Sequence, residues 1–160
     1  MVKLFLTDVD GCLTDGGMYY TAEGDAMKRF CVYDGMGMSL LRQSGIKCGI
    51  LTSETTDIVA RRAQKLHLEY LCMGVGAHNI KSKLEAAKEI CAELGIGLDE
   101  VSYVGDDIND IELLCAVGLP ACPCSAMPAV KNIPNILVLS RPGGAGAIRE
   151  LCDKILEEKL

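Results

Sequence analysis

The chain has 160 residues, of which 49% are hydrophobic, and its formal net charge is −6 at pH 7. This length fits one domain, residues 1–160, with an aliphatic core, since the chain holds two Phe and no Trp. The negative charge argues against nucleic acid or an anionic membrane as the main partner. Nine irregularly spaced cysteines indicate reduced thiols, so we expect a cytoplasmic protein, and no apolar run is long enough to span a bilayer.

The first candidate strand covers residues 4–7 and leads directly into Asp8 and Asp10. Three apolar residues and a threonine in a row are typical of a strand buried on both faces of a parallel sheet. Ligands of such sheets bind beyond the carboxyl ends of the strands, where both carboxylates would lie. Because two neighbouring carboxylates repel each other, we expect a cation between them, most simply Mg2+, which prefers oxygen ligands.

Residues 18–33 are typical of a β-hairpin with a turn at Glu23, Gly24 and Asp25. A parallel sheet does not need this hairpin, so we expect it to project. Its apolar side chains would then be exposed unless another subunit covers them, which favours an oligomer. These side chains are Met18, Tyr19, Tyr20, Phe30, Val32 and Tyr33.

Strands and helices alternate through the rest of the chain. Apolar spacing and turn residues predict a helix from Asp34, its N-cap, to residue 43, and a helical turn capped by Ser125. Further helices are expected at 55–66, 80–94, 111–117 and from Ala147 to about Glu158, and strands at 46–51, 69–72, 101–104, 119–121 and 136–139. This order predicts an α/β fold, a doubly wound, Rossmann-like parallel sheet with helices on both faces.

The strand ends bring together residues suited to phosphate transfer. Asp8 can attack phosphorus and form an aspartyl-phosphate, while Asp10 protonates the leaving alcohol and later deprotonates water. A Mg2+ ion held by Asp8, Asp106 and a backbone carbonyl would neutralise the attacking carboxylate. Thr52 and a lysine, either Lys81 or Lys83, would bind the other phosphate oxygens.

These motifs resemble those of the haloacid dehalogenase superfamily. Its first motif is similar to Asp8-Val-Asp10-Gly-Cys-Leu-Thr14, its second to Thr52, its third to Lys83 and its fourth to Gly105-Asp106-Asp107-Ile-Asn-Asp110. Over essentially its whole length, the chain most resembles the capless phosphatases of nine- and eight-carbon ulosonic acids. This resemblance implies a Mg2+-dependent phosphatase without a cap domain. It favours Lys83 over Lys81 as the phosphate-binding lysine. It also implies that Asp10 belongs to the metal site, that Ser53 belongs to the phosphate site, and that Asp107 and Asp110 support the site from the fourth motif.

The residues after Thr52 separate substrates within the group that the chain resembles. Phosphatases of octulosonate 8-phosphate usually have Gly-Arg there, whereas this chain has Ser53 and Glu54. Glu54 followed by Arg62 and Lys65 looks like the nonulosonate 9-phosphate type. We therefore expect a sialic-type sugar acid 9-phosphate as the substrate, contacted by Glu54, Arg62, Lys65 and Thr14, with octulosonate 8-phosphate as the alternative.

The same resemblance implies a homotetramer. In it the hairpins form a central barrel and a neighbour's surface replaces the missing cap. The glycine-rich setting of Arg141 and Arg149 suggests that these two residues contact a neighbouring site.

Two other classes of protein share some of these parts. A signalling receiver domain would carry its phosphorylated Asp at the end of the third strand, but here that strand ends at Leu71-Cys72. A non-catalytic tetramerisation module, related to the C-terminal domains of sialic-acid cytidylyltransferases, tends to lack the first Asp. Because Asp8, Asp10, Lys83 and Asp106 are all present, the sequence favours an active enzyme.

Overall fold

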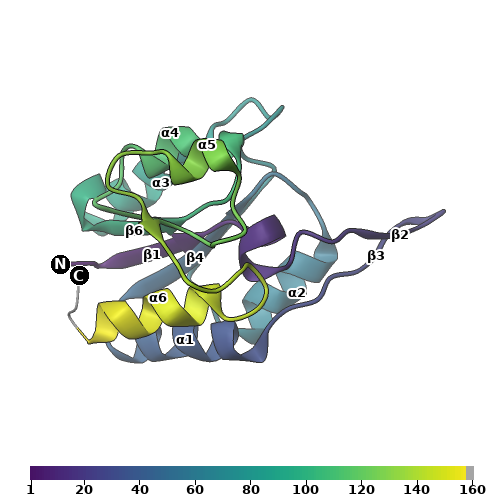
Figure 1. Cartoon of the computed structure of the whole chain (residues 1–160), viewed down its shortest axis with the longest axis horizontal. Coiled ribbons are helices and arrows are strands. Elements are labelled where there is room, and N and C mark those ends of the chain that lie inside the picture. The colour runs from purple at the N-terminus through teal and green to yellow at the C-terminus, as the bar shows by residue number, and fades with distance from the viewer. Residues whose placement is uncertain (158–160) are drawn as a thin grey trace.

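A computed structural model describes residues 1–157 and has a six-stranded parallel sheet at its centre (Figure 1). The strand order is β5-β4-β1-β6-β7-β8, which is the predicted doubly wound α/β arrangement. The strands are β1 (Leu4–Thr7), β4 (Lys47–Thr52), β5 (Tyr70–Met73), β6 (Val101–Val104), β7 (Leu119–Cys122) and β8 (Leu137–Val138). The helices are α1 (Val32–Gln43), α2 (Asp57–Lys65), α3 (Lys83–Leu94), α4 (Ile111–Leu114), α5 (Pro128–Lys131) and α6 (Ala147–Leu156). The predicted end of the last helix at Glu158 lies outside the described residues.

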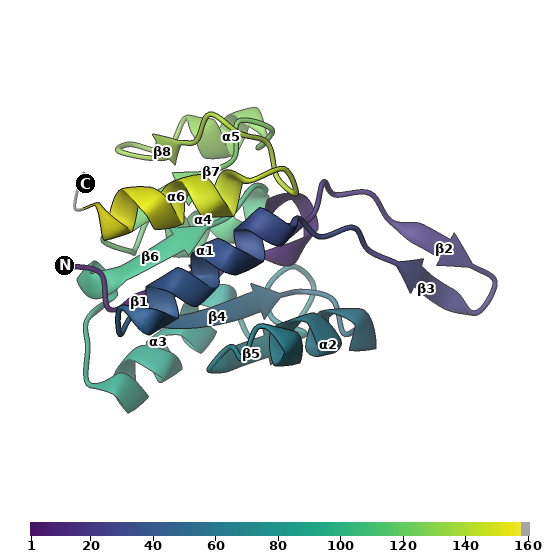
Figure 2. The ribbon, with the colours of Figure 1, turned by 90° about the horizontal axis from the view of Figure 1, so that it is seen from below.

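Strand β1 is the centre of the sheet and pairs in parallel with β4 and β6. All four of its residues are buried, because helices cover both faces. Phe5 packs into the core beneath α1, α2 and α6, whereas Leu4 and Leu6 pack beneath α3, α4 and α5. Figure 2 shows α1 and α6 crossing the sheet side by side. The alternation of side chains along β1 therefore joins two separate hydrophobic cores.

Helix α1 begins two residues before the predicted position, and Asp34 does not cap it. Cys31 precedes the helix, and the buried Asp34 carboxylate instead accepts a hydrogen bond of 2.9 Å from the backbone N–H of Arg149 in α6. A Cβ on Gly37 would lie 3.1 Å from the Arg149 Cα, so the glycine permits close packing of the two helices. The sequence pattern located the helix but not this contact, which joins residues far apart in the chain.

Several other element ends also differ from prediction. Helix α3 begins at Lys83 rather than residue 80, because Ser82 forms a capping box with Glu85 and starts the helix there. Helix α4 ends at Leu114, before residue 117. Ser125 does not cap a helix; its hydroxyl accepts a hydrogen bond from the Gly143 N–H, and Met127 precedes α5. Within residues 1–157 no helix is both long and apolar enough to cross a bilayer.

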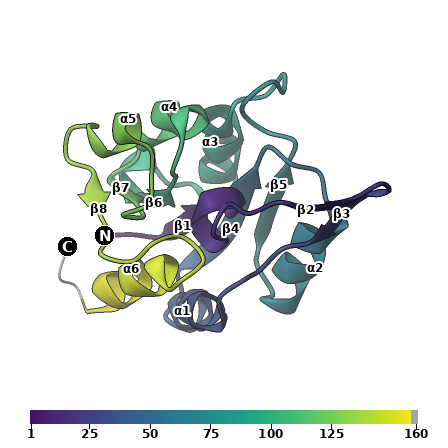
Figure 3. The ribbon, with the colours of Figure 1, turned by 45° about the vertical axis from the view of Figure 1, so that its right-hand side comes forward.

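The predicted hairpin is present and projects away from the sheet (Figure 3). Its strands are β2 (Tyr19–Thr21) and β3 (Gly24–Met27), so it is shorter than residues 18–33 and turns at Ala22 and Glu23. The return strand ends at Met27, and Val32 and Tyr33 belong to α1. Phe30 packs against the core, whereas Tyr20 and Met27 are each 60% exposed.

Residues 141–146 form a loop that packs against the loop after β1. The Gly144 N–H donates to the Cys12 carbonyl at 3.0 Å, and a Cβ on Gly143 would lie 1.9 Å from the Gly11 carbonyl oxygen. The loop is itself held by Glu150, whose carboxylate accepts from the backbone N–H groups of Ser140 and Arg141. The glycines therefore serve a contact within this chain.

We expect Gly143→Ala to destabilise the protein by about 1–3 kcal/mol, because the added methyl meets backbone that must shift. The free energy of unfolding from urea denaturation measures this loss. Ala145→Ser, at an exposed position in the same loop, is the matched control and should leave stability unchanged. If the two variants have the same free energy of unfolding, then the close approach of Gly143 to the loop after β1 does not contribute to stability as expected.

Candidate active site

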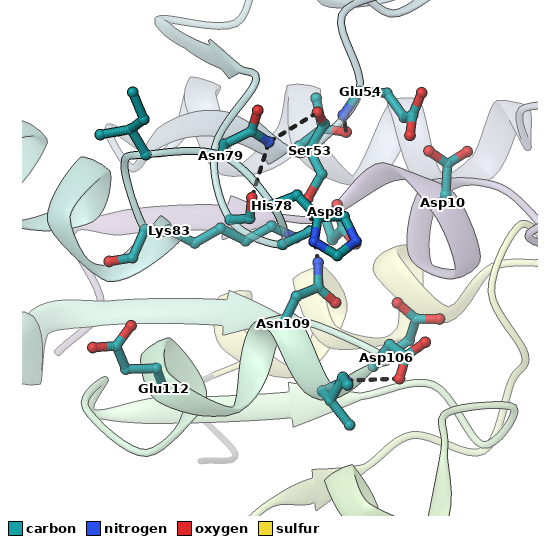
Figure 4. Close-up of a pocket in the computed structure, with 17 residues that line it drawn as sticks. Asp8, Asp10, Ser53, Glu54, His78, Asn79, Lys83, Asp106, Asn109 and Glu112 are labelled. Atoms are coloured by element: carbon teal, nitrogen blue, oxygen red, sulfur yellow. Dashed lines mark hydrogen bonds and ion pairs between the residues drawn. The ribbon is translucent and has the colours of Figure 1, made fainter.

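Three neighbouring strands deliver the predicted site residues to one edge of the sheet. Asp8 follows β1, Thr52 ends β4, and Asp106 follows β6 after Gly105. Lys83 reaches the same place from the first turn of α3 (Figure 4). Together they line a pocket of about 700 Å³, as expected for the carboxyl edge of a parallel sheet.

Lys83 connects two buried carboxylates in this pocket. Its ammonium lies 3.0 Å from Asp8 Oδ1 and 2.7 Å from Asp110 Oδ1, and its side chain is 1% exposed. Lys81, the other candidate, pairs with Glu89 on the surface. The structure therefore places Lys83 and not Lys81 against Asp8, because the capping box at Ser82 sets which lysine lies inside the helix.

Asp110 is the most heavily hydrogen-bonded carboxylate of the site. Its Oδ1 accepts from Lys83 and, at 2.5 Å, from the Tyr103 hydroxyl, while its Oδ2 accepts from the backbone N–H groups of Asp106 and Asp107. Both oxygens are thus already satisfied by protein donors. Asp110 accordingly holds Lys83 and the turn that carries Asp106. Nothing in the sequence indicated that Tyr103 belongs to the site, because its contact with Asp110 depends on how the turn after β6 folds back.

The Asp8 and Asp106 carboxylates lack enough positive charge around them. Burial raises the pKa of Asp8 to about 7, an effect that Lys83 opposes and Asp110 reinforces. Burial, Asp110 and Asp107 raise the pKa of Asp106 to about 7. Burial by itself would lower the pKa of Lys83, yet Asp8 and Asp110 raise it above its ordinary value. One lysine among three carboxylates leaves a site that favours an additional cation.

The geometry of these carboxylates fits a divalent ion. Oxygens of Asp8, Asp106 and Asp110 lie within 4.8 Å of one another. A Cβ on Gly11 would lie 1.9 Å from Asp106 Oδ2, so the glycine leaves the space that Asp106 occupies. Because Asp110 is already hydrogen-bonded, Asp8 and Asp106 have the oxygens available for a hard cation such as Mg2+.

Asp10 lines the pocket but its carboxylate is engaged elsewhere. Lys28, which follows β3 at the base of the hairpin, donates to Asp10 Oδ1 at 2.5 Å. The Asp10 side chain is therefore not part of the carboxylate cluster, and its assignment as a metal ligand stays a prediction that the side chain does not favour. Sequence reasoning missed Lys28, since a single lysine after a hairpin gives no signal of a long-range partner.

The candidate phosphate-binding residues form a hydrogen-bonded border of the pocket. The Ser53 hydroxyl donates to the Val75 carbonyl at 3.0 Å and accepts from Asn109 at 3.4 Å. Asn79 donates to the Ser53 carbonyl, and the Thr52 hydroxyl accepts from the Glu54 N–H. The serine that replaces the usual glycine is thus hydrogen-bonded to neighbouring residues. Asn79 and Asn109 were not singled out from sequence.

The predicted substrate-binding residues are not all near the pocket. Glu54 lines it, and Figure 4 shows its carboxylate directed toward Asp10. Arg62 instead donates to the Cys31 carbonyl and lies over the Phe30 ring, 5.2 Å from its centroid. Lys65 is exposed at the end of α2, and the buried Thr14 hydroxyl bonds to the backbone of its own loop. Of these four residues, the single chain brings Glu54 alone to the pocket.

The family of the chain follows from comparison with known proteins. The sequence profile described as haloacid dehalogenase-like hydrolase matches residues 19–121. The 3-deoxy-D-manno-octulosonate 8-phosphate phosphatase of Haemophilus influenzae is 35% identical over 159 residues, which cover 98% of this chain and 83% of the relative. The protein of the same description from Escherichia coli K12 is 35% identical over 97% of this chain and 79% of its own length. The chain belongs to the haloacid dehalogenase-like hydrolases.

Solved structures agree with the fold. The cobalt-bound form of the octulosonate 8-phosphate phosphatase from Haemophilus influenzae has a TM-score of 0.88 at 35% identity, over 98% of this chain and 88% of that one. The enzyme from Moraxella catarrhalis, in complex with magnesium ion, phosphate ion and the sugar acid, has a TM-score of 0.89 at 35% identity, over 98% and 86%. The predicted superfamily, fold and enzyme class, a phosphatase, are confirmed.

In metal-free protein the raised pKa values of Asp8 and Asp106 predict that stability falls as pH rises. The unfolded carboxylates release protons near pH 4 and the folded ones near pH 7, so their stabilising contribution is present below about pH 4 and lost toward pH 7. We expect Asp106→Asn to melt increasingly above wild type, in EDTA, as pH rises from 4 to 7. Added Mg2+ should raise the wild-type melting temperature more at pH 7 than at pH 5.

The measurement is thermal melting by circular dichroism across this pH range. Asp99→Asn is the control, since Asp99 is exposed and lies just before β6, at the opposite edge of the sheet from the pocket. If the melting temperatures of Asp106→Asn and wild type depend on pH in the same way, then the raised pKa of Asp106 does not destabilise the folded protein as expected.

Proposed function

We propose that the chain is a Mg2+-dependent phosphatase that hydrolyses the phosphomonoester of a 3-deoxy ulosonic acid, with octulosonate 8-phosphate as the favoured substrate. The observation that carries the proposal is the joint placement of Asp8, Lys83 and Asp106 at one edge of the sheet. Relatives with this activity that match nearly the whole chain support it.

The residues of the pocket can be given chemical roles. Asp8 would attack phosphorus, so that the bond from phosphorus to the sugar oxygen breaks and an aspartyl-phosphate forms. Asp10 would donate a proton to that oxygen and then accept one from the water that hydrolyses the intermediate. Lys83, Thr52 and the backbone at Ser53 would bind phosphate oxygens. A Mg2+ ion on Asp8 and Asp106, when bound, supplies positive charge that allows two anions to approach.

The substrate preference differs from the one that the sequence favoured. The nine-carbon hypothesis depended on Glu54, Arg62 and Lys65 acting together, but Arg62 and Lys65 lie outside the pocket of this chain. The comparisons support the eight-carbon acid better. A nine-carbon acid 9-phosphate is the second candidate, because Ser53 and Glu54 do line the pocket.

With Mg2+ present, we expect the wild-type protein to release phosphate from octulosonate 8-phosphate with a higher kcat/KM than from nine-carbon acid 9-phosphates. Asp8→Asn should lower kcat by about a thousandfold or more, because it removes the nucleophile. Asp99→Asn, far from the pocket, should retain full activity.

A reversed preference would favour the nine-carbon candidate and keep the mechanism. Absence of turnover with every substrate would contradict the proposed function and favour the non-catalytic tetramerisation module.

The proposal includes assembly of the chain into the homotetramer that the family resemblance implies. A two-stranded ribbon is marginally stable alone, and this one exposes apolar side chains together with the start of α1. The pocket is lined by one lysine against six carboxylates, and that lysine is already paired, so a second copy would supply the cation for a sugar-acid carboxylate. The exposed side chains are Met18, Tyr19, Tyr20, Met27, Val32, Tyr33 and Met36.

We expect Tyr20→Glu to reduce the assembly to smaller species and to lower activity, because a charge would be desolvated in the interface. Size-exclusion chromatography with light scattering measures the mass. Val138→Glu, which places the same charge on an exposed apolar residue of β8, is the control and should leave the mass unchanged. A wild-type protein that is already monomeric at enzymatic concentrations would contradict the assembly.

A further inference from the structure

Lys28 has a buried side chain that the proposed mechanism does not use. Its side chain is 2% exposed, although lysine is rarely buried without a partner. The partner is Asp10, whose Oδ1 lies 2.5 Å from the Lys28 ammonium. Within residues 1–157 this ammonium is the one side-chain or backbone donor recorded for the Asp10 carboxylate. The position of the Asp10 side chain therefore depends on a residue 18 positions further along the chain.

The two carboxylate oxygens of Asp10 have different surroundings, because Lys28 contacts Oδ1. Oδ1 is directed to Lys28, while the side chain stays 25% exposed and lines the pocket. Figure 4 shows this carboxylate on the pocket side of the loop after β1. An ammonium group has three donors and no acceptor, so a proton on the Asp10 carboxyl cannot point at Lys28 from Oδ1. Oδ1 is thus occupied by the Lys28 donor, whereas no donor within residues 1–157 contacts Oδ2.

We propose that Lys28 is a positioning residue that fixes Asp10 so that Oδ2 exchanges the proton with the leaving oxygen. The inference rests on the proposed function. As the bond between phosphorus and the sugar oxygen breaks, its electron pair passes to that oxygen, which takes the proton from Oδ2. When water attacks the aspartyl-phosphate, the same Oδ2 accepts the proton of the water. Lys28 touches neither reactant and acts through Asp10.

This role predicts a dependence on the leaving group. A sugar hydroxyl is a poor leaving group and needs the proton, whereas a nitrophenolate leaves without one. We expect Lys28→Met to lower kcat/KM for octulosonate 8-phosphate by about 10- to 100-fold, which is less than or equal to the smallest usual contribution of general acid catalysis, because Asp10 itself is still present. The kcat/KM for p-nitrophenyl phosphate should change less than about threefold. This ratio reports the steps up to departure of the leaving group and excludes the later hydrolysis of the aspartyl-phosphate, in which Asp10 serves both substrates alike. Lys28→Arg should lie between Lys28→Met and wild type.

A purely structural ion pair would behave differently. If Lys28 merely tied the hairpin base to the loop after β1, Lys28→Met would lower kcat/KM for both substrates equally, and that result would overturn the proposal. Lys3→Met, which removes an exposed ion pair with Glu100, is the matched control and should affect neither substrate. If Lys28→Met fails to fold, Lys28→Arg provides the test. A displaced Asp10 should again impair turnover of octulosonate 8-phosphate more than that of p-nitrophenyl phosphate, by a smaller factor.

The wild-type protein separates this inference from the proposed function. Wild-type turnover of both substrates with equal losses in the Lys28 variants would remove only the role of Lys28. A wild-type protein that hydrolyses neither substrate would contradict the proposed function, and the inference with it.

Discussion

The crowding of buried negative charge at the carboxyl edge of the sheet is the constraint on which the site depends. Asp8, Asp106 and Asp110 approach within 4.8 Å, and Lys83 contacts two of them. Buried charges of one sign are costly unless each is paired or hydrogen-bonded. Three local features of the fold pair or accommodate these charges. The capping box starts α3 at Lys83, so that this lysine reaches the carboxylates. The turn after β6 directs two backbone N–H groups to Asp110, and Gly11 leaves space for Asp106.

The framework around this edge is held by contacts between distant segments. Buried Asp34 in α1 accepts from the first turn of α6, and burial raises its pKa while the N–H groups of α6 lower it. The loop that precedes α6 packs its glycines onto the loop after β1, where Asp10 lies. Helix α6 is thus joined to α1 directly and to the loop after β1 through the glycine-rich loop that precedes it. The sequence suggested that this glycine-rich segment carries contacts to a neighbouring subunit. In the structure its glycines pack against the loop after β1 of the same chain.

Sequence predicted the parts of the site that depend on local order. Buried strands ending in Asp8, Thr52 and Gly105-Asp106 are visible because apolar runs and polar ends lie next to each other in the chain. The contacts of Lys28, Tyr103 and Asp34 could not be predicted, since each partner is brought in by tertiary packing. Arg62 shows the limit of a periodic argument: it does face a neighbouring element, but that element is the segment before α1 and not the pocket.

The two carboxylates to which we assign the proposed chemistry are each held by a lysine from a different part of the fold. Asp8 Oδ1 is bound by Lys83 from α3, and Asp10 Oδ1 by Lys28 from the base of the hairpin. The proposed nucleophile is therefore placed by the sheet and its helices, whereas the proposed proton carrier is placed by a ribbon that carries exposed apolar side chains. If further copies cover that ribbon, assembly fixes Lys28 and through it Asp10. Quaternary structure would then act on the proposed proton-transfer step while leaving the position of the proposed nucleophile unchanged.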